Sequence, residues 1–346
     1  MKTYVLKVAA TVAIIMLCHY AILLTIWSPI AAEYWVREFI VVKRYEAASM
    51  PSPKLIFVGG SCTLFGIDAA QVQKSLGIPA INFGLHAGLR LEAHLAEARF
   101  VAKPGDIVII SLEPAYYDYY TFRWNSWDVR NAIAWDHENL ESLPLPRRLQ
   151  IYLESSDILI SLDLLWSDAA EHFFPAAIHR RLQAMAPEQT IIARYLAERE
   201  TSRAFAFAIN NIDANGDVLN TQGTGLDFRG NTWAPTRPST ISPYAESVLT
   251  PFLAEMKSRR VRVIFDYTPY LVYEKPGEEW KASEARFQEE IHRIGGELLE
   301  RRDAFFYPST LFFNSNLHLN AEGRELRTQT LIEALKKRLG LPTVAP

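Results

Sequence analysis

The chain carries a serine in a position typical of nucleophilic chemistry. Ser61 lies in the segment Gly59-Gly60-Ser61-Cys62, directly after the short apolar run at 54–58. In an open α/β sheet, ligands bind beyond the carboxyl ends of the strands, so Ser61 would lie where chemistry usually takes place. The backbone amide of Ser61 at such a strand-to-helix turn can also stabilise an oxyanion. The alternative is a Gly-Gly-Ser turn that only caps a helix.

A histidine near the C-terminus could serve as the base for this serine. His318 follows an aromatic segment and precedes a helical pattern, in a loop from which it could face the end of the first strand. A nucleophilic serine needs such a base, and the base needs an orienting group. No Asp stands just before His318, but Asn314 can accept a hydrogen bond from a ring N–H. A surface or capping histidine is the alternative.

Two further candidates follow the next two strands. Gly84 ends the run at 78–83, and a glycine there lets the backbone approach a ligand and present its amide as an oxyanion donor. Its alternative is a glycine required only by turn geometry. Glu113 follows the third strand and accepts hydrogen bonds when ionised. Substrate binding and a satisfied strand-end carboxylate are its two alternatives.

Aromatic residues cluster directly after Glu113. Tyr116 begins a segment that is rich in tyrosine, phenylalanine and tryptophan up to position 124. Aromatic faces bury a large area beside a polar rim, so the segment could stack on a sugar next to the site. It could equally be the base of a cap that packs on the sheet. Tyr116 is therefore a candidate substrate-binding residue.

No metal or cofactor site is expected. His86 and His94 lack a Cys or carboxylate that would complete a ligand spacing. Residues 213–217 (DANGD) resemble a calcium loop, but the glycine comes too early and no downstream Glu is in register, which favours a turn. Cys62 has no neighbour in sequence that would lower its thiol pKa.

The elements around these residues alternate between strand and helix. We expect a strand at 54–58, a helix at 68–76 capped by Asp68 and closed by Gly77, a strand at 78–83, a helix at 89–101 and a strand at 106–112. This order is typical of right-handed crossovers and a parallel sheet with helices on its faces.

The second half of the sheet follows an insertion at about 120–244. No glycine lies between Asp106 and Asn215, which favours a mostly helical insertion with one helix at 192–207, followed by a loop at 215–243. The α/β pattern then resumes. We expect a helix at 245–259, a strand at 261–267 and two more helices at 279–299 and 322–339.

The N-terminus predicts a membrane anchor at 1–28. Lys2 and Lys7 precede an uncharged apolar run of about the twenty residues that a spanning helix needs. A cleaved signal peptide is the alternative, but its apolar core is usually about 7 to 15 residues long. Positive charge before the span places the N-terminus in the cytoplasm and exports the rest of the chain. A polar and aromatic connector at 29–53 ends in Pro51-Ser52-Pro53, and the α/β domain occupies 54–340.

Composition excludes some classes of partner. The net charge of −3 among 346 residues gives no basic surface, and no Lys/Arg stripe is interleaved with aromatics, so nucleic acid is not expected as a partner. Cys18 and Cys62 are the only cysteines, which excludes a disulfide framework.

Taken together, the segments GGSCTLFGID, NFGLHAGL, KPGDIVIISLE and LHLNAEG resemble the SGNH/GDSL hydrolase superfamily. The closer resemblance is to membrane-anchored bacterial members that act in alginate O-acetylation and D-alanyl-teichoic-acid transfer. It covers 54–118 and 245–337. It implies a flavodoxin-like three-layer α/β sandwich with Ser61 as nucleophile, His318 as base, and the amides of Ser61 and Gly84 as the oxyanion hole. The chain departs from the family pattern at Asn314, where an acidic residue is expected, and at 111–114, where a Gly-x-Asn-Asp block is expected.

The resemblance also implies a function. It is serine-dependent acyl transfer or acyl-ester hydrolysis on an exported cell-surface polysaccharide, with O-acetylation as the expected reaction and no cofactor. The protein would be a single-pass bacterial inner-membrane protein with a periplasmic catalytic domain, and a multi-spanning membrane acyltransferase would supply the acyl group to a glycan acceptor. The alternative is a catalytically inactive SGNH-like binding or assembly subunit of the polysaccharide machinery. A lipid or thioester hydrolase is a third option.

Overall fold

A computed structural model describes most of the chain, and the chain divides into two compact units. The residues described are 2–25, 32–118, 126–136, 145–146, 148, 183–223, 240–271, 278–299 and 306–342. One unit comprises Met1–Glu38 with Thr121–Ile191, and the other comprises Phe39–Tyr120 with Ile192–Pro346. All the candidate site residues belong to the second unit.

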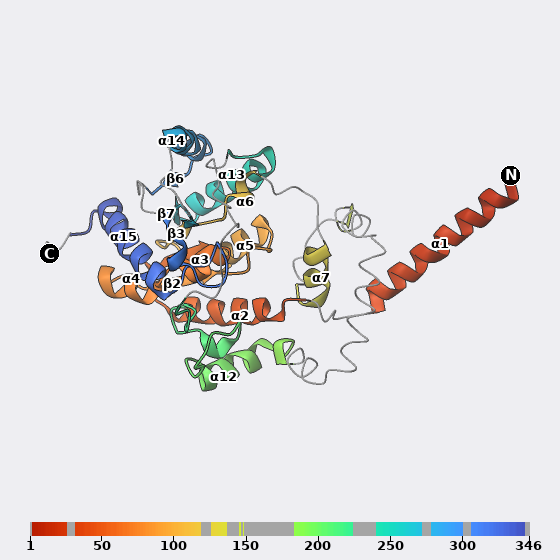
Figure 1. Ribbon diagram of the computed structural model, residues 1–346, viewed down its shortest axis with the longest axis horizontal. Coiled ribbons are helices and arrows are strands. Elements are labelled where there is room, and N and C mark those ends of the chain that lie inside the picture. The colour runs from red at the N-terminus through yellow and green to blue at the C-terminus, as the bar shows by residue number, and fades with distance from the viewer. Residues whose placement is uncertain are drawn as a thin grey trace. The chain divides into compact units, whose positions relative to one another are not determined.

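The second unit is built on a five-stranded parallel sheet in the order β2-β1-β3-β4-β6. Its strands are β1 (Leu55–Gly59), β2 (Ala80–Gly84), β3 (Ile107–Ile110), β4 (Arg262–Phe265) and β6 (Glu297–Leu298). This order is compatible with a flavodoxin-like fold, in which the chain changes direction between the first strand and the third. The predicted α/β class with a parallel sheet is confirmed (Figure 1). A second sheet pairs β5 (Tyr270–Leu271) with β7 (Phe306–Tyr307).

Helices cover both faces of the sheet. On one face α15 (Ala321–Leu339) packs against α4 (Ala69–Leu76), and on the other α13 (Pro243–Ser258) packs against α5 (Leu91–Val101) (Figure 1). Because side chains alternate along a strand, each strand contributes to two cores. The first core joins Leu55 and Phe57 of β1 to Val72 of α4 and Leu331 of α15. Helix α14 (Glu278–Arg293) packs beside β6.

The predicted ends of two helices are confirmed. Asp68 caps α4 by accepting a hydrogen bond of 2.7 Å from the Gln71 amide, and Gly77 ends the helix in the left-handed region at φ 67°. In α15, Asn320 caps the N-terminus by accepting a hydrogen bond from the Gly323 amide, and Gly340 ends the helix in the left-handed region. These residues satisfy backbone groups that have no partner within a helix.

Two helix predictions are wrong at their ends. The helix expected at 279–299 ends at Arg293, because Gly295 turns the chain at φ 85° and the chain then enters β6. The helix expected at 192–207 is α12 (Glu188–Glu198), and Glu200 follows it at φ 62°.

The connector expected at 29–53 contains a helix instead. Helix α2 (Tyr34–Ser49) has 16 residues. Within the second unit its Phe39, Val42 and Ala47 are fully buried. Burial of this apolar face stabilises a helix whose sequence looked only polar and aromatic.

The shorter helices and the N-terminal helix complete the described elements. They are α1 (Lys2–Thr25), α3 (Ser61–Gly66), α6 (Ala115–Asp118), α7 (Ser126–Ala134) and two 3₁₀ turns at Ile209–Asn211 and Ser309–Leu311. Among the described residues, none of the helices has both the length and the apolar character needed to cross a bilayer. The predicted transmembrane anchor is therefore unsupported and stays a prediction. Most of the predicted insertion, at 137–144 and 149–182, and residues 224–239 of the predicted loop lie outside the described residues.

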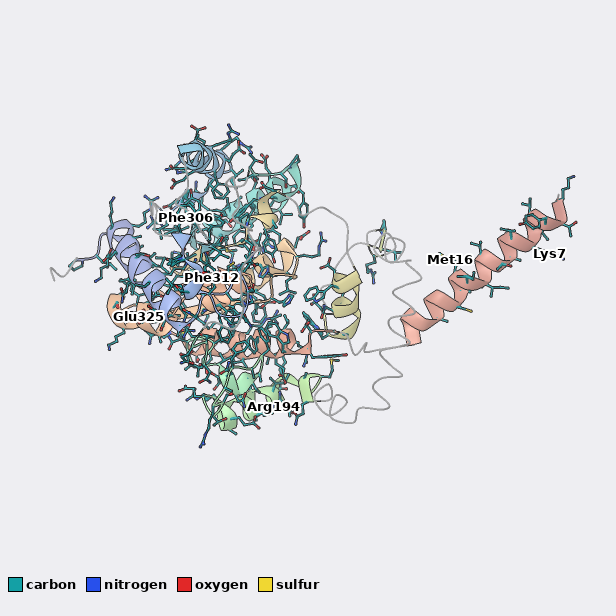
Figure 2. All side chains as sticks on the ribbon, viewed as in Figure 1. Lys7, Met16, Arg194, Phe306, Phe312 and Glu325 are labelled. Carbon is teal, nitrogen blue, oxygen red and sulfur yellow. The ribbon has the colours of Figure 1, made fainter. Side chains whose placement is uncertain are left out.

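A small apolar cluster supports the loop that carries His318. It contains Leu271, Tyr307, Leu311, Phe312 and Leu319. Phe312 is fully buried, whereas Glu325 on α15 is exposed, and both are labelled in Figure 2. An isolated bridge between Phe312 and Leu319 closes the loop at its base.

Candidate active site

Ser61 lies at the first position of α3, immediately beyond the end of β1. The turn is tight: a Cβ on Gly59 would lie 2.1 Å from the Ser111 carbonyl oxygen, so only glycine allows this close approach. The Ser61 side chain is 7% exposed, and its hydroxyl makes no hydrogen bond within the described part of the chain. Ser61 therefore presents an unengaged hydroxyl at the point where the strand order reverses.

His318 lies against the same short helix. Its ring stacks on Phe65, with centroids 4.0 Å apart and planes 7° apart. Phe65 is four residues after Ser61, and residues at this spacing lie on one face of a helix with Cβ atoms about 5–6 Å apart. No hydrogen bond joins Ser61 to His318. His318 thus contacts the helix that carries Ser61, but the two side chains are not hydrogen-bonded to each other.

Asn314 orients the ring of His318. Its Oδ1 lies 2.7 Å from His318 Nδ1. An Nδ1–H that donates to Asn314 leaves the lone pair on Nε2, as a general base requires. Burial and, to a smaller extent, the nearby His86 together lower the pKa of His318 to about 3. The imidazole is therefore neutral at ordinary pH.

Glu113 reaches from the end of β3 to the start of α3. Its Oε1 accepts a hydrogen bond of 2.9 Å from the Cys62 amide. Its Oε2 is buried and has no hydrogen-bond partner within the described residues. A Cβ on Gly60 would lie 2.3 Å from that oxygen, so the carboxyl group occupies space that only a glycine leaves open. Glu113 is therefore only half satisfied, which differs from the satisfied strand-end carboxylate expected as one alternative, and its role in substrate binding stays a prediction.

Gly84 does not present a free amide in this conformation. Its N–H donates to Asn82 Oδ1 at 2.9 Å, and its carbonyl accepts from Lys43 Nζ at 2.9 Å. A Cβ on Gly84 would lie 2.2 Å from the Leu64 backbone nitrogen. The glycine allows β2 to lie directly against α3, and the structure offers no support for its predicted oxyanion role.

Tyr116 is part of the interior and not of an exposed surface. It is 1% exposed, and its hydroxyl lies 2.7 Å from the carbonyl oxygens of Ala87 and Leu89 and 2.9 Å from His94 Nε2. In this conformation Tyr116 cannot stack on a substrate, because almost none of its ring is accessible. Its prediction as a substrate-binding residue is not supported.

Cys62 is buried beneath the site. Burial raises the pKa of its thiol well above the ordinary value, and the charge of Glu113 raises it further. Its neutral thiol is a poor nucleophile.

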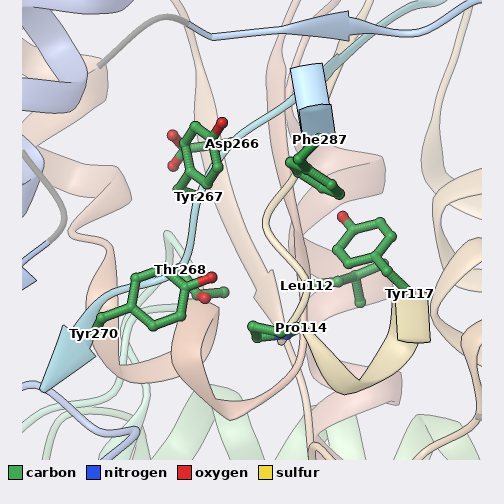
Figure 3. Close-up of a pocket in the computed structure, with 8 residues that line it drawn as sticks. All are labelled: Leu112, Pro114, Tyr117, Asp266, Tyr267, Thr268, Tyr270 and Phe287. Atoms are coloured by element: carbon green, nitrogen blue, oxygen red, sulfur yellow. The ribbon is translucent and has the colours of Figure 1, made fainter. Parts of the chain in front are cut away.

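Hollows beside the site are lined by a different set of aromatic residues. One, of about 240 Å³ and partly open to solvent, lies between the ends of β3 and β4 and is shown in Figure 3. It is lined by Leu112, Pro114, Tyr117, Asp266, Tyr267, Thr268, Tyr270 and Phe287. A second hollow, of about 260 Å³, shares Pro114, Thr268 and Tyr270 with it and also touches Leu317, the residue before His318. Ser61 lines neither of these two hollows.

The sequence analysis did not identify Arg327, whose side chain connects the elements that form the site. Arg327 is fully buried. Its guanidinium donates to Ser111 Oγ at 2.7 Å, to the Tyr267 carbonyl at 2.9 Å, to the Cys62 carbonyl at 3.1 Å and to Asp266 Oδ2 at 3.2 Å. One side chain of α15 thus ties α3 to the ends of β3 and β4. The available signal was its position four residues before Leu331 and eight before Leu335, on the apolar stripe of its helix.

A second buried network was also missed. Lys43 of α2 donates to the carbonyls of Asn82 and Gly84 at 2.8 and 2.9 Å, and burial lowers the pKa of Lys43 to about 7. The Asn82 amide group in turn donates to the Thr63 carbonyl and to Asp217 Oδ1. Burial raises the pKa of Asp217, and the charge of Asp213 raises it further. This network fixes the position of α3 on β2.

The DANGD segment forms the expected turn. The Asp213 amide donates to the Asp217 carbonyl, and the Gly216 amide donates to the Asp213 carbonyl. Among the described residues, no group of three or more His, Cys, Asp or Glu side chains is arranged to hold a metal ion. His94 of the suspected His86/His94 pair is bonded to Tyr116.

The buried His94 is expected to make the folded state less stable at acid pH. Burial lowers the pKa of His94 to about 3, below an ordinary value of about 6.5. Between these two values the unfolded chain binds more protons than the folded chain, so stability falls as the pH drops from about 6.5 toward 3. We expect His94→Gln to make the urea midpoint fall less steeply over this window. The exposed His292→Gln is the control. Parallel pH dependence in His94→Gln and the wild type would contradict this prediction.

Comparison with known proteins adds no family to this description. No protein-family model matches the chain. No curated protein matches it either.

Proposed function

We propose that the chain is a serine-dependent acyltransferase or acyl esterase of the SGNH/GDSL type. The observation that carries this proposal is the unengaged Ser61 hydroxyl at the start of α3, together with the neutral His318 ring stacked on Phe65 of the same helix. The parallel sheet and the position of Ser61 at its switch point support the proposal, as does the sequence resemblance.

The reaction proceeds through an acyl-enzyme. Ser61 Oγ attacks the acyl carbon of the donor, its proton passes to His318 Nε2, and the carbonyl electron pair moves onto oxygen. The tetrahedral species collapses, and the leaving group takes the proton from His318. An acceptor hydroxyl then attacks the acyl group and gives its proton to His318. The second tetrahedral species collapses to the acylated acceptor, and His318 returns the proton to Ser61 Oγ. The amide of Ser61 stabilises the oxyanion in both halves.

The sequence resemblance supplies the substrate, partners and location in this proposal. The acceptor is an exported cell-surface polysaccharide, with O-acetylation as the reaction. Because a single anchor cannot carry acyl groups across a membrane, a multi-spanning acyltransferase delivers them. The domain works at the outer face of a bacterial inner membrane.

The test uses the full-length chain and two site variants. We expect the wild type to hydrolyse a short-chain nitrophenyl ester and to react with a fluorophosphonate probe at Ser61. Ser61→Ala and His318→Ala should fall to background in both assays. Ser258→Ala and His292→Ala, at exposed positions on α13 and α14, are the matched controls. Equal activity in the wild type and Ser61→Ala would exclude the proposal.

A second candidate function is a non-catalytic subunit of a polysaccharide assembly. Two observations favour it: His318 is oriented by an amide and not by a carboxylate, and the Gly84 amide is already bonded. Loss of the carboxylate costs about ten-thousandfold in the serine-protease example. A wild type that binds a polysaccharide, but is no faster than its Ser61→Ala variant on esters and on acyl transfer, would favour this candidate.

A further inference from the structure

Glu113 has an environment that suits a neutral carboxyl group better than an ionised one. An ionised carboxylate offers about four lone-pair sites. In this structure the Cys62 amide serves Oε1 at 2.9 Å, while Oε2 is buried without a hydrogen-bond partner among the described residues. Burying a charge that is not fully paired is costly, whereas a protonated Oε2 carries no charge.

The charged and titratable groups around Glu113 come from every element packed on it. Cys62 of α3 and Tyr117 of α6 interact with it directly, and Arg327 of α15 lies one contact further away, bonded to the Cys62 carbonyl and to Asp266 at the end of β4. Arg327 already binds Asp266 Oδ2 at 3.2 Å, and Cys62 and Tyr117 both have pKa values held well above the ordinary range by burial. Burial raises the pKa of Glu113, and interactions with the backbone of Cys62, Glu113 and Gly60 and with the Cys62 thiol oppose this rise only in part.

The carboxyl group of Glu113 also lies beside the candidate nucleophile. A Cβ on Gly60, the residue before Ser61, would lie 2.3 Å from Oε2 and 2.5 Å from Oε1. Strands β1 and β3 are direct neighbours in the sheet, so the residues that follow them meet at one edge. Since the Gly84 amide already donates to Asn82 Oδ1, it cannot supply the second oxyanion donor in this conformation.

We propose that Glu113 works in its neutral form and donates its Oε2–H hydrogen bond to the substrate carbonyl oxygen as Ser61 attacks the acyl carbon. This inference rests on the proposed function. The Glu113 proton stays on Oε2 throughout: the bond to the oxygen strengthens as negative charge develops and weakens when the carbonyl re-forms. A carboxylic acid kept neutral by an apolar site can serve as such a donor.

The test compares glutamine and alanine at position 113 in the full-length chain. Glutamine keeps an acceptor for the Cys62 amide and places an N–H donor where Oε2–H stood. We expect Glu113→Gln to retain kcat within about threefold, whereas Glu113→Ala loses the hundredfold or more that removal of one oxyanion donor costs. The wild type should lose activity as rising pH ionises Glu113, and Glu113→Gln should not. Thermal melting shows whether each variant folds.

A second measurement does not depend on activity. The infrared difference between the wild type and Glu113→Gln at neutral pH should contain the carbonyl band of a protonated carboxyl group. Absence of this band, or a Glu113→Gln variant as inactive as Glu113→Ala while Ser61 remains essential, would overturn the role of Glu113 alone. Activity that does not depend on Ser61 would overturn the proposed function and this role with it.

Discussion

Replacement of Arg327 by methionine is expected to lower the free energy of unfolding by about 3–5 kcal/mol, which is the usual cost of removing one partner of a buried ion pair. Methionine fills part of the volume but donates no hydrogen bond. Asp266, which is 3% exposed, would keep its charge and lose a partner. The Ser111 hydroxyl and the carbonyls of Cys62 and Tyr267 would lose a donor as well.

The measurement is urea unfolding of Arg327→Met beside a control on the same helix. Arg338 pairs with Glu297 on the surface, where an ion pair contributes only about 0–1 kcal/mol. Arg338→Met should therefore change the midpoint little. The double variant Arg327→Met/Asp266→Asn should recover part of the loss, because it removes the stranded charge. A loss no larger than that of Arg338→Met would show that Arg327 does not hold these elements together.

Local sequence signals were sufficient to find the sheet. The strands at 54–58 and 106–112 are short apolar runs bounded by Gly or Pro, and the structure has β1 and β3 there. Such runs are typical of strands that are buried on both faces of a sheet. They are too short to form a helix of ordinary length. Asp68 and Gly77 defined α4 because capping depends on residues close in sequence.

The errors occurred where distant packing overrides a local pattern. The apolar face of α2 is buried only by folding of the second unit, so the segment read as a connector. The pattern at 279–299 stayed helical through Gly295-Gly296. A Cβ on Gly296 would lie 2.7 Å from the Phe265 ring, which shows that this glycine pair packs β6 against β4.

The candidate site was predictable in part for the same reason. Ser61 and His318 stood out because their segments join a strand or a loop to a helix. The supporting side chains could not be found that way, since Arg327 and Lys43 are charged residues whose partners lie far away along the chain. The sequence indicated that the backbone at Gly84 is closely approached by another group. It did not reveal that this group is helix α3 and not a ligand.

Replacement of Gly84 by alanine separates these two explanations of the glycine. A Cβ at this position would lie 2.2 Å from the Leu64 nitrogen, 2.6 Å from Leu64 Cα and 2.8 Å from the Thr63 carbonyl carbon. All three are backbone atoms of α3 and cannot rotate away. We expect Gly84→Ala to lower the free energy of unfolding by about 3 kcal/mol, the upper end of the usual range for overpacked cores.

The control is Gly77→Ala, which tests backbone strain without a collision. Gly77 has φ 67°, and a Cβ there would meet nothing within 4 Å, so only the left-handed conformation costs about 1–2 kcal/mol. Urea unfolding should rank Gly84→Ala as the more damaging variant. An oxyanion donor at Gly84 predicts a different pattern, because alanine keeps the backbone N–H and needs no change in stability. If Gly84→Ala is as stable as the wild type, α3 does not lie against β2 as described. If it is destabilised and loses esterase activity together with stability, the glycine serves to seat the helix that carries Ser61.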